Sequence, residues 1–143
     1  MSGVFYFFII FANWLANWQI DKSTNWHINN MTKILIIEDE SAIRRVLSKI
    51  LQEESKEYEV FEASDGIEGL EKLKKDDYDL VLCDIKMPKM DGLEVLTEAK
   101  KIKPEVPFVM ISGHGDLETA VNAMRLGAYD YISKPPDLNR LLN

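Results

Sequence analysis

The sequence of 143 residues contains a single cysteine, Cys83. One thiol excludes an internal disulfide and a zinc site built from several cysteines, and it is consistent with a reducing compartment such as the cytoplasm. Basic residues are also few, because 17 Lys and Arg stand against 24 Asp and Glu, giving a net charge of −7. Clustered Lys and Arg make the phosphate contacts of nucleic-acid binding, so this segment is not expected to bind DNA by itself.

The sequence also lacks a run of about 20 apolar residues, the length that a membrane-spanning helix needs. The first charged residue is Asp21, but the apolar run before it covers only residues 4–12, and Asn13 and Asn17 interrupt the segment after that run. No Lys or Arg precedes this run and no A-x-A site comes after it, which disfavours a signal peptide. Residues 1–30 therefore form an apolar extension with three open interpretations. In the first, the start codon is assigned too early and the protein begins at Met31. In the second, the segment is an amphipathic or dimer-forming helix, and in the third it contacts a membrane surface.

The extension is rich in large aromatic side chains. If all of them were exposed, they would form an apolar patch too large for a free monomer, which would favour association. These residues are Phe5, Phe7, Phe8, Phe11, Trp14 and Trp18.

From residue 31 onward, strand and helix patterns alternate with short connections. Continuous apolar runs at 34–37, 80–83 and 108–111 predict central strands of a parallel sheet. The mixed segment 57–63 predicts an edge strand, and 129–133 predicts a fifth strand. Apolar residues at helical spacing predict helices over 41–54, 65–75, 93–102 and 116–126. This order predicts an α/β fold, a doubly wound five-stranded parallel sheet with helices on both faces, over residues 31–143.

Polar residues follow the predicted strands where each one ends: Glu38 and Asp39, then Asp84, Ser112 and Lys134. Ligands of such sheets bind at the carboxyl ends of the strands, so these side chains are expected at one edge. Three carboxylates brought together repel one another unless a cation is present, and oxygen ligands with room for water suit Mg²⁺.

A phosphate group could approach such a site. Lys134 and the Ser112 hydroxyl could hold its oxygens, and Asp84 is then a candidate nucleophile that forms an aspartyl-phosphate. Pro88 and Gly92 are turn residues, and they are expected to bend the chain away from the open side of Asp84.

The segments IIEDE, DIKMPKMDG, ISGHG and GAYDYISKPP occur in this order. With them, residues 31–143 resemble the receiver domain of a two-component response regulator. The resemblance implies a flavodoxin-like strand order, 2-1-3-4-5, and a cytoplasmic switch that accepts a phosphoryl group from a sensor histidine kinase in a Mg²⁺-dependent reaction. Such a domain is a phosphoacceptor and not an ordinary enzyme, since it catalyses only its own phosphorylation and dephosphorylation.

The resemblance also implies a role for each site residue. Asp84 would be the phosphoacceptor, and Ser112 and Lys134 would contact the phosphoryl group. Tyr131 would move together with Ser112 as the switch. The metal ligands would be Asp39, Asp84, the backbone carbonyl of Lys86 and, through water, Glu38.

Residues 112–142 further resemble receivers of the nitrogen-regulator class of sigma-54-dependent activators. That similarity implies transcription regulation through an output domain that this chain lacks, which would make any DNA contact. The receiver resemblance itself implies homodimer formation on activation. The sequence ends at Asn143, expected to lie within the last receiver helix.

Two other functions deserve comparison. A hydrolase of the haloacid-dehalogenase type also uses an aspartate nucleophile and Mg²⁺. It needs a second aspartate two residues later, where this chain has Lys86, and no cap domain fits in the length. A receiver fold that serves as an interaction or dimerisation module without phosphorylation remains the alternative.

Overall fold

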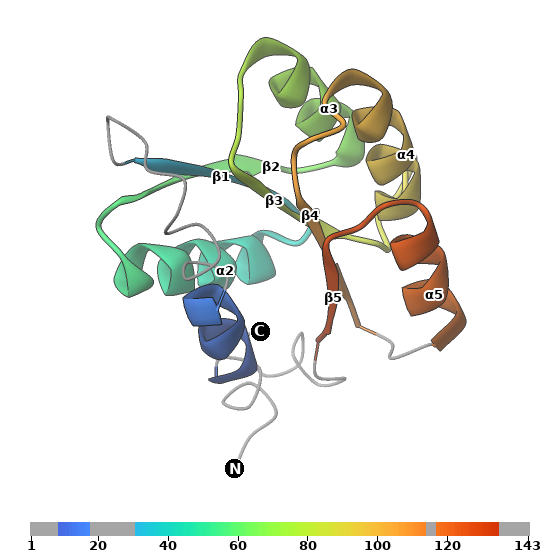
Figure 1. Cartoon of the computed structure of the whole chain (residues 1–143). Coiled ribbons are helices and arrows are strands. Elements are labelled where there is room, and N and C mark those ends of the chain that lie inside the picture. The colour runs from blue at the N-terminus through green and yellow to red at the C-terminus, as the bar shows by residue number, and fades with distance from the viewer. Residues whose placement is uncertain (1–8, 18–30, 114–116, 135–143) are drawn as a thin grey trace.

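The computed structural model describes residues 9–17, 31–113 and 117–134. Its centre is a five-stranded parallel sheet in the order β2-β1-β3-β4-β5 (Figure 1). The predicted fold class and strand order are confirmed. The strands are β1 (Thr32–Ile37), β2 (Tyr58–Ala63), β3 (Leu80–Asp84), β4 (Phe108–Ser112) and β5 (Asp130–Ser133).

The central strands are apolar throughout because both faces of the sheet are covered. Every residue of β3 and β4 is buried. In β1, Ile34 and Ile36 belong to the core on one face, and Leu35 and Ile37 belong to the core on the other. This alternation is the two-residue period of a strand. Strand β2 lies at the edge and exposes its glutamates, which explains its mixed composition.

Three helices pack on one face of the sheet: α3 (Gly66–Lys75), α4 (Gly92–Ile102) and α5 (Leu117–Arg125), as Figure 1 shows. The first two begin at aspartate caps. The Asp65 side chain accepts a hydrogen bond from the amide of Glu68, and Asp91 and Glu94 form a capping box. Asp65 is therefore the cap of α3 and not its first helical residue.

The opposite face is covered by α2 (Ser41–Glu54) and by a helix of residues 9–17, drawn in blue in Figure 1. Phe11 and Leu15 of this short helix are fully buried in the core on that face. The condition for a large apolar patch, exposure of all six aromatic side chains, is therefore not met, because Phe11 is buried and Trp14 is partly buried. The other four aromatic residues of that patch lie outside the described residues.

Within residues 9–17, 31–113 and 117–134, no helix is long and apolar enough to cross a membrane. The last receiver helix, within which Asn143 is expected to lie, is outside the described residues, since residues 135–143 are not described.

The loop between β3 and α4 returns closely to the strand that it leaves. The Gly92 amide donates to the carbonyl of Ile85 at 2.7 Å. A Cβ atom at Gly92 would lie 2.1 Å from the backbone oxygen of Asp84, well inside van der Waals contact. Glycine is required here by close approach to the backbone, and it keeps the loop tight beneath Asp84.

We predict that Gly92→Ala lowers the free energy of unfolding by about 1 to 3 kcal/mol, because the added methyl group must displace the Asp84 backbone. Urea denaturation measures the change. Gly113→Ala is the matched control, since a Cβ there meets no heavy atom within 4 Å. Equal stability of the two variants would contradict the close approach.

Candidate functional site

The carboxyl ends of four strands bring the predicted polar residues to one edge of the sheet. Glu38 follows β1, Asp84 ends β3, Ser112 ends β4, and Lys134 follows β5. The register agrees, because Asp84 pairs with Ile111 and Ser112 pairs with Ser133 in neighbouring strands. The convergence expected from the sequence is therefore present in the structure.

Lys134 lies between two of the carboxylates. Its Nζ is 2.5 Å from Glu38 Oε1 and 3.1 Å from Asp84 Oδ1. All three side chains are buried, with at most 8% of each residue exposed. The Lys134 backbone amide also donates to the carbonyl of Ser112 at 2.7 Å. The Lys134 backbone is thus fixed to the end of β4, and its ammonium group is fixed by two carboxylates.

Asp39 completes an acidic cluster with Glu38 and Asp84. One carboxylate oxygen from each residue lies within 4.8 Å of the other two. Asp39 Oδ1 is buried and accepts no hydrogen bond from the described residues. A buried carboxylate oxygen without a partner is costly, so this atom indicates that a cation or water belongs beside it. The three carboxylates carry more negative charge than one ammonium group balances, and they offer only oxygen ligands. Both features fit a divalent ion such as Mg²⁺.

Burial and neighbouring charges shift the pKa values of the site residues. Burial raises the pKa of Glu38 from 4.5 to about 8; Lys134 opposes the shift and the nearby Asp84 adds to it. Burial is also the main reason that the pKa of Asp84 is raised, again against the effect of Lys134. Burial disfavours the charge of Lys134, but the two carboxylates outweigh it and raise the pKa of the lysine.

The remaining predicted residues are Ser112, Tyr131 and Lys86, and none of them takes part in the ion pairs of Lys134. Ser112 is buried at the end of β4. Tyr131 is half-buried on β5 and packs against the core beneath α3, α4 and α5. Lys86 lies in the loop after β3 with an exposed side chain, so its predicted role concerns its backbone carbonyl alone.

Sequence reasoning missed Arg44, a residue of α2. Its Nη1 donates to the backbone oxygen of Glu38 at 2.7 Å, and its Nε donates to Glu62 at 3.2 Å. Arg44 thereby fixes the backbone at the end of β1, where the acidic pair begins. Arg44 belongs to none of the motifs. The only sequence signal for it is its position on the predicted helix that directly follows the acidic pair.

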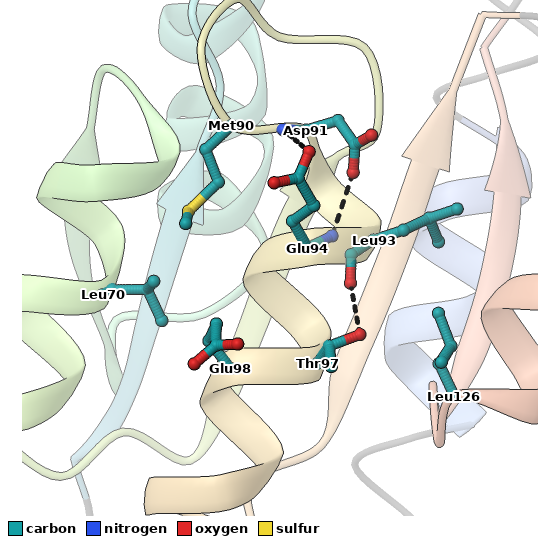
Figure 2. A pocket seen from close by; sticks show the side chains of 8 residues that line it. All are labelled: Leu70, Met90, Asp91, Leu93, Glu94, Thr97, Glu98 and Leu126. Carbon is teal, nitrogen blue, oxygen red and sulfur yellow. Dashed lines mark hydrogen bonds between the residues drawn. The ribbon is translucent and has the colours of Figure 1, made fainter.

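A pocket of about 450 Å³ lies elsewhere, over α4 and the loop that precedes it (Figure 2). In Figure 2, Asp91 and Glu94 turn toward each other in the capping box, and the Thr97 hydroxyl donates to the carbonyl of Leu93. These polar groups serve the helix itself. The described residues that line this pocket form no cluster of converging reactive groups, so the acidic edge of the sheet is the better candidate site.

Comparison with known proteins places this geometry in a family. The sequence model of the response regulator receiver domain matches residues 34–143. Transcriptional regulatory protein ZraR of Klebsiella oxytoca is 38% identical over 108 residues, which cover 76% of this chain and 24% of that protein. The crystal structure of the receiver domain of NtrX from Brucella abortus is 44% identical with a TM-score of 0.67, and the match covers 76% of this chain and 91% of that one.

A further solved structure is the response regulator TrrA from Thermotoga maritima, in complex with Mg²⁺-BeF. It is 34% identical with a TM-score of 0.67, and the match covers 78% of this chain and 93% of that chain. These similarities confirm the resemblance inferred from the motifs, including that to receivers of nitrogen-regulator-type activators.

The raised pKa of Glu38 predicts a pH-dependent stability in metal-free buffer. Between 4.5 and about 8 the folded chain keeps a proton that the unfolded chain releases. The free energy of unfolding therefore falls as the pH rises through this interval. Glu38→Gln removes the titrating group, so we expect the wild type to lose several kcal/mol, at most about 5, relative to the variant across the interval. Urea denaturation at several pH values tests this, and parallel pH curves for the two proteins would refute it.

Proposed function

We propose, because the chain belongs to the response regulator receiver domain family, that Asp84 accepts a phosphoryl group from a phosphohistidine of a sensor kinase and that this modification switches the domain. The observation that carries the proposal is the position of Asp84. It ends a fully buried central strand, 3.1 Å from the Lys134 ammonium, and belongs to an acidic cluster in which an Asp39 oxygen has no hydrogen-bond partner among the described residues.

In the transfer, an Asp84 carboxylate oxygen attacks phosphorus while the bond from phosphorus to the histidine nitrogen breaks. The products are an acyl phosphate on Asp84 and a free imidazole on the kinase. The buried strand delivers the carboxylate rigidly, so little conformational freedom is lost on attack. Lys134 already faces Asp84, and its ammonium can follow the negative charge onto the phosphoryl oxygens.

Glu38, Asp39 and Asp84, with the backbone carbonyl of Lys86, would hold Mg²⁺, with Glu38 acting through water. The grouping of the three carboxylates supports this set, as does the TrrA structure with Mg²⁺-BeF. When bound, the ion supplies positive charge beside the phosphoryl oxygens.

The switch uses Ser112 and Tyr131. Ser112 lies at the strand end next to Lys134, where its hydroxyl can reach a phosphoryl group on Asp84. Tyr131, half-buried on the neighbouring strand, then moves inward. These movements change the face formed by α5 and β5. Leu117, Val121 and Met124 of α5 are exposed apolar side chains, which supports dimerisation through this face.

The chain spans about a quarter of the length of the curated relatives that it matches. ZraR is a transcriptional regulatory protein, so we propose that phosphorylation here controls an output domain that regulates transcription in the cytoplasm. DNA contact would belong to that domain, and this segment remains the regulatory module.

The covalent step is tested by intact mass spectrometry after incubation with acetyl phosphate and Mg²⁺. The wild type should gain about 80 Da, one phosphoryl group, and Asp84→Asn should gain nothing because it lacks the nucleophile. Asp76→Asn is the matched control, since its side chain is largely exposed at the far end of α3. Labelling of Asp84→Asn would refute the assignment. No labelling of any protein would favour the interaction module that works without phosphate.

The metal site is tested separately by isothermal titration calorimetry with Mg²⁺. We expect Asp39→Asn to weaken Mg²⁺ binding at least about tenfold, because it removes one negative charge and one ligand oxygen. Glu40→Gln removes the same charge at the exposed next position and should bind Mg²⁺ nearly as the wild type does. Equal affinities for the two variants would place the metal elsewhere.

A further inference from the structure

The sheet face beside α2 is completed by the helix of residues 9–17. Helix α2 covers part of this face with Ile43, Leu47 and Leu51. Phe11 and Leu15 of the short helix pack into the same core, and neither has any exposed surface. Burying two such side chains contributes about 3 to 6 kcal/mol. The nine helical residues that the structure describes here would be marginal as an isolated helix, so their stability comes from this packing.

A specific polar contact fixes the helix on the sheet. Trp14 Nε1 donates a hydrogen bond to Asp130 Oδ2 at 2.6 Å. The Trp14 ring also meets the Tyr129 ring edge-on, with centroids 6.2 Å apart. A hydrogen bond to a carboxylate is stronger than one between neutral groups and has a defined direction. The helix is therefore positioned against β5 in particular, and not only against a general apolar surface.

The same aspartate ties the helix to the strand that carries Lys134. While Oδ2 of Asp130 accepts from Trp14, its Oδ1 accepts from the backbone amide of Tyr131 at 2.7 Å. Strand β5 has only four residues, and it lies at the edge of the sheet with β4 as its neighbour. Lys134 follows directly. A contact at the first residue of so short a strand restrains the lysine at its end.

We propose that this sheet face is a binding surface for the helix of residues 9–17, and that the docked helix, through Trp14 and Asp130, holds β5 and Lys134 in place opposite Asp84. The effect on phosphorylation rests on the function proposed above, whereas the restraint on β5 does not. Because coupling between two sites is reciprocal, whatever removes the helix from this face also weakens the site at the end of β5.

The test uses the full chain with Trp14→Phe, which keeps an aromatic ring and removes the hydrogen-bond donor. Ile10→Ala is the matched control, since Ile10 is on the same helix and is 54% exposed. Amide hydrogen exchange is measured without a phosphodonor. Exchange at residues 130–134 should be about tenfold faster in Trp14→Phe, the size expected for one lost hydrogen bond to a charged group, and unchanged in Ile10→Ala. Equal exchange in the two variants would overturn the proposal.

Phosphorylation by acetyl phosphate is then timed in the same three proteins. Trp14→Phe should be labelled several-fold more slowly than Ile10→Ala, because Lys134 is less well held. Equal rates would overturn the coupling. If none of the three is labelled but exchange in β5 differs as expected, the proposed function fails and the restraint on β5 stands.

Occupancy of the surface by the chain's own helix is tested with Phe11→Ala. This change should abolish the exchange protection of residues 9–17 in a protein that stays monomeric in analytical ultracentrifugation. Protection in the wild type that falls on dilution, together with a dimeric mass, would show that the helix docks on a second copy and would overturn the intramolecular assignment.

Discussion

The site depends on one interaction, the buried ion pairing of the Lys134 ammonium group with the Glu38 and Asp84 carboxylates. Glu38 follows β1 and Asp84 ends β3, and both carboxylates are buried close to the same ammonium group, an arrangement that like charges tolerate poorly. Lys134 makes their approach tolerable and draws the ends of β1, β3 and β5 together. Removing one partner of such a buried pair leaves an uncompensated charge, so each member constrains the other two. The neutralisation is incomplete, however, because Asp39 adds a third carboxylate with an unpaired oxygen. The cluster is therefore built to attract a further cation.

Rigid delivery of these groups follows from the layers of the fold. Because β1, β3 and β4 are covered on both faces, their strand ends cannot shift without disturbing a close-packed core. The loop after β3 adds a second restraint, since Gly92 sits directly against the backbone of Asp84. Strand β5 differs, because it is short and lies at the edge. The site thus joins a carboxylate on a strand covered on both faces to a lysine that follows a short edge strand, a combination that fits the proposed switch.

Much of this arrangement could be predicted from the sequence, for a physical reason. Strands buried on both faces leave continuous apolar runs, and the polar residue that ends each run marks the edge where ligands bind. Contacts between distant residues leave no such local signal. Trp14 and Asp130 are 116 positions apart, and neither lies in a pattern that names its partner. The raised pKa of Glu38 likewise depends on burial that only the assembled fold creates. For the same reason, the inward orientation of Phe11 could not be read from a segment that looked equally suited to self-association.

The acidic edge and the N-terminal helix meet on the same short strand. Asp130 begins β5 and accepts hydrogen bonds from Trp14 and from the Tyr131 amide, and Lys134 follows its last residue. A phosphoryl group on Asp84 would compete with Glu38 for the Lys134 ammonium, so the lysine must reorient as the acyl phosphate forms. The four residues of β5 pair in register with Val109–Ser112 of β4, so a shift at one end of this short strand affects its other end. In the proposed switch, the free energy that holds the helix on the sheet would be linked to the free energy of the charge rearrangement at the opposite end of the strand.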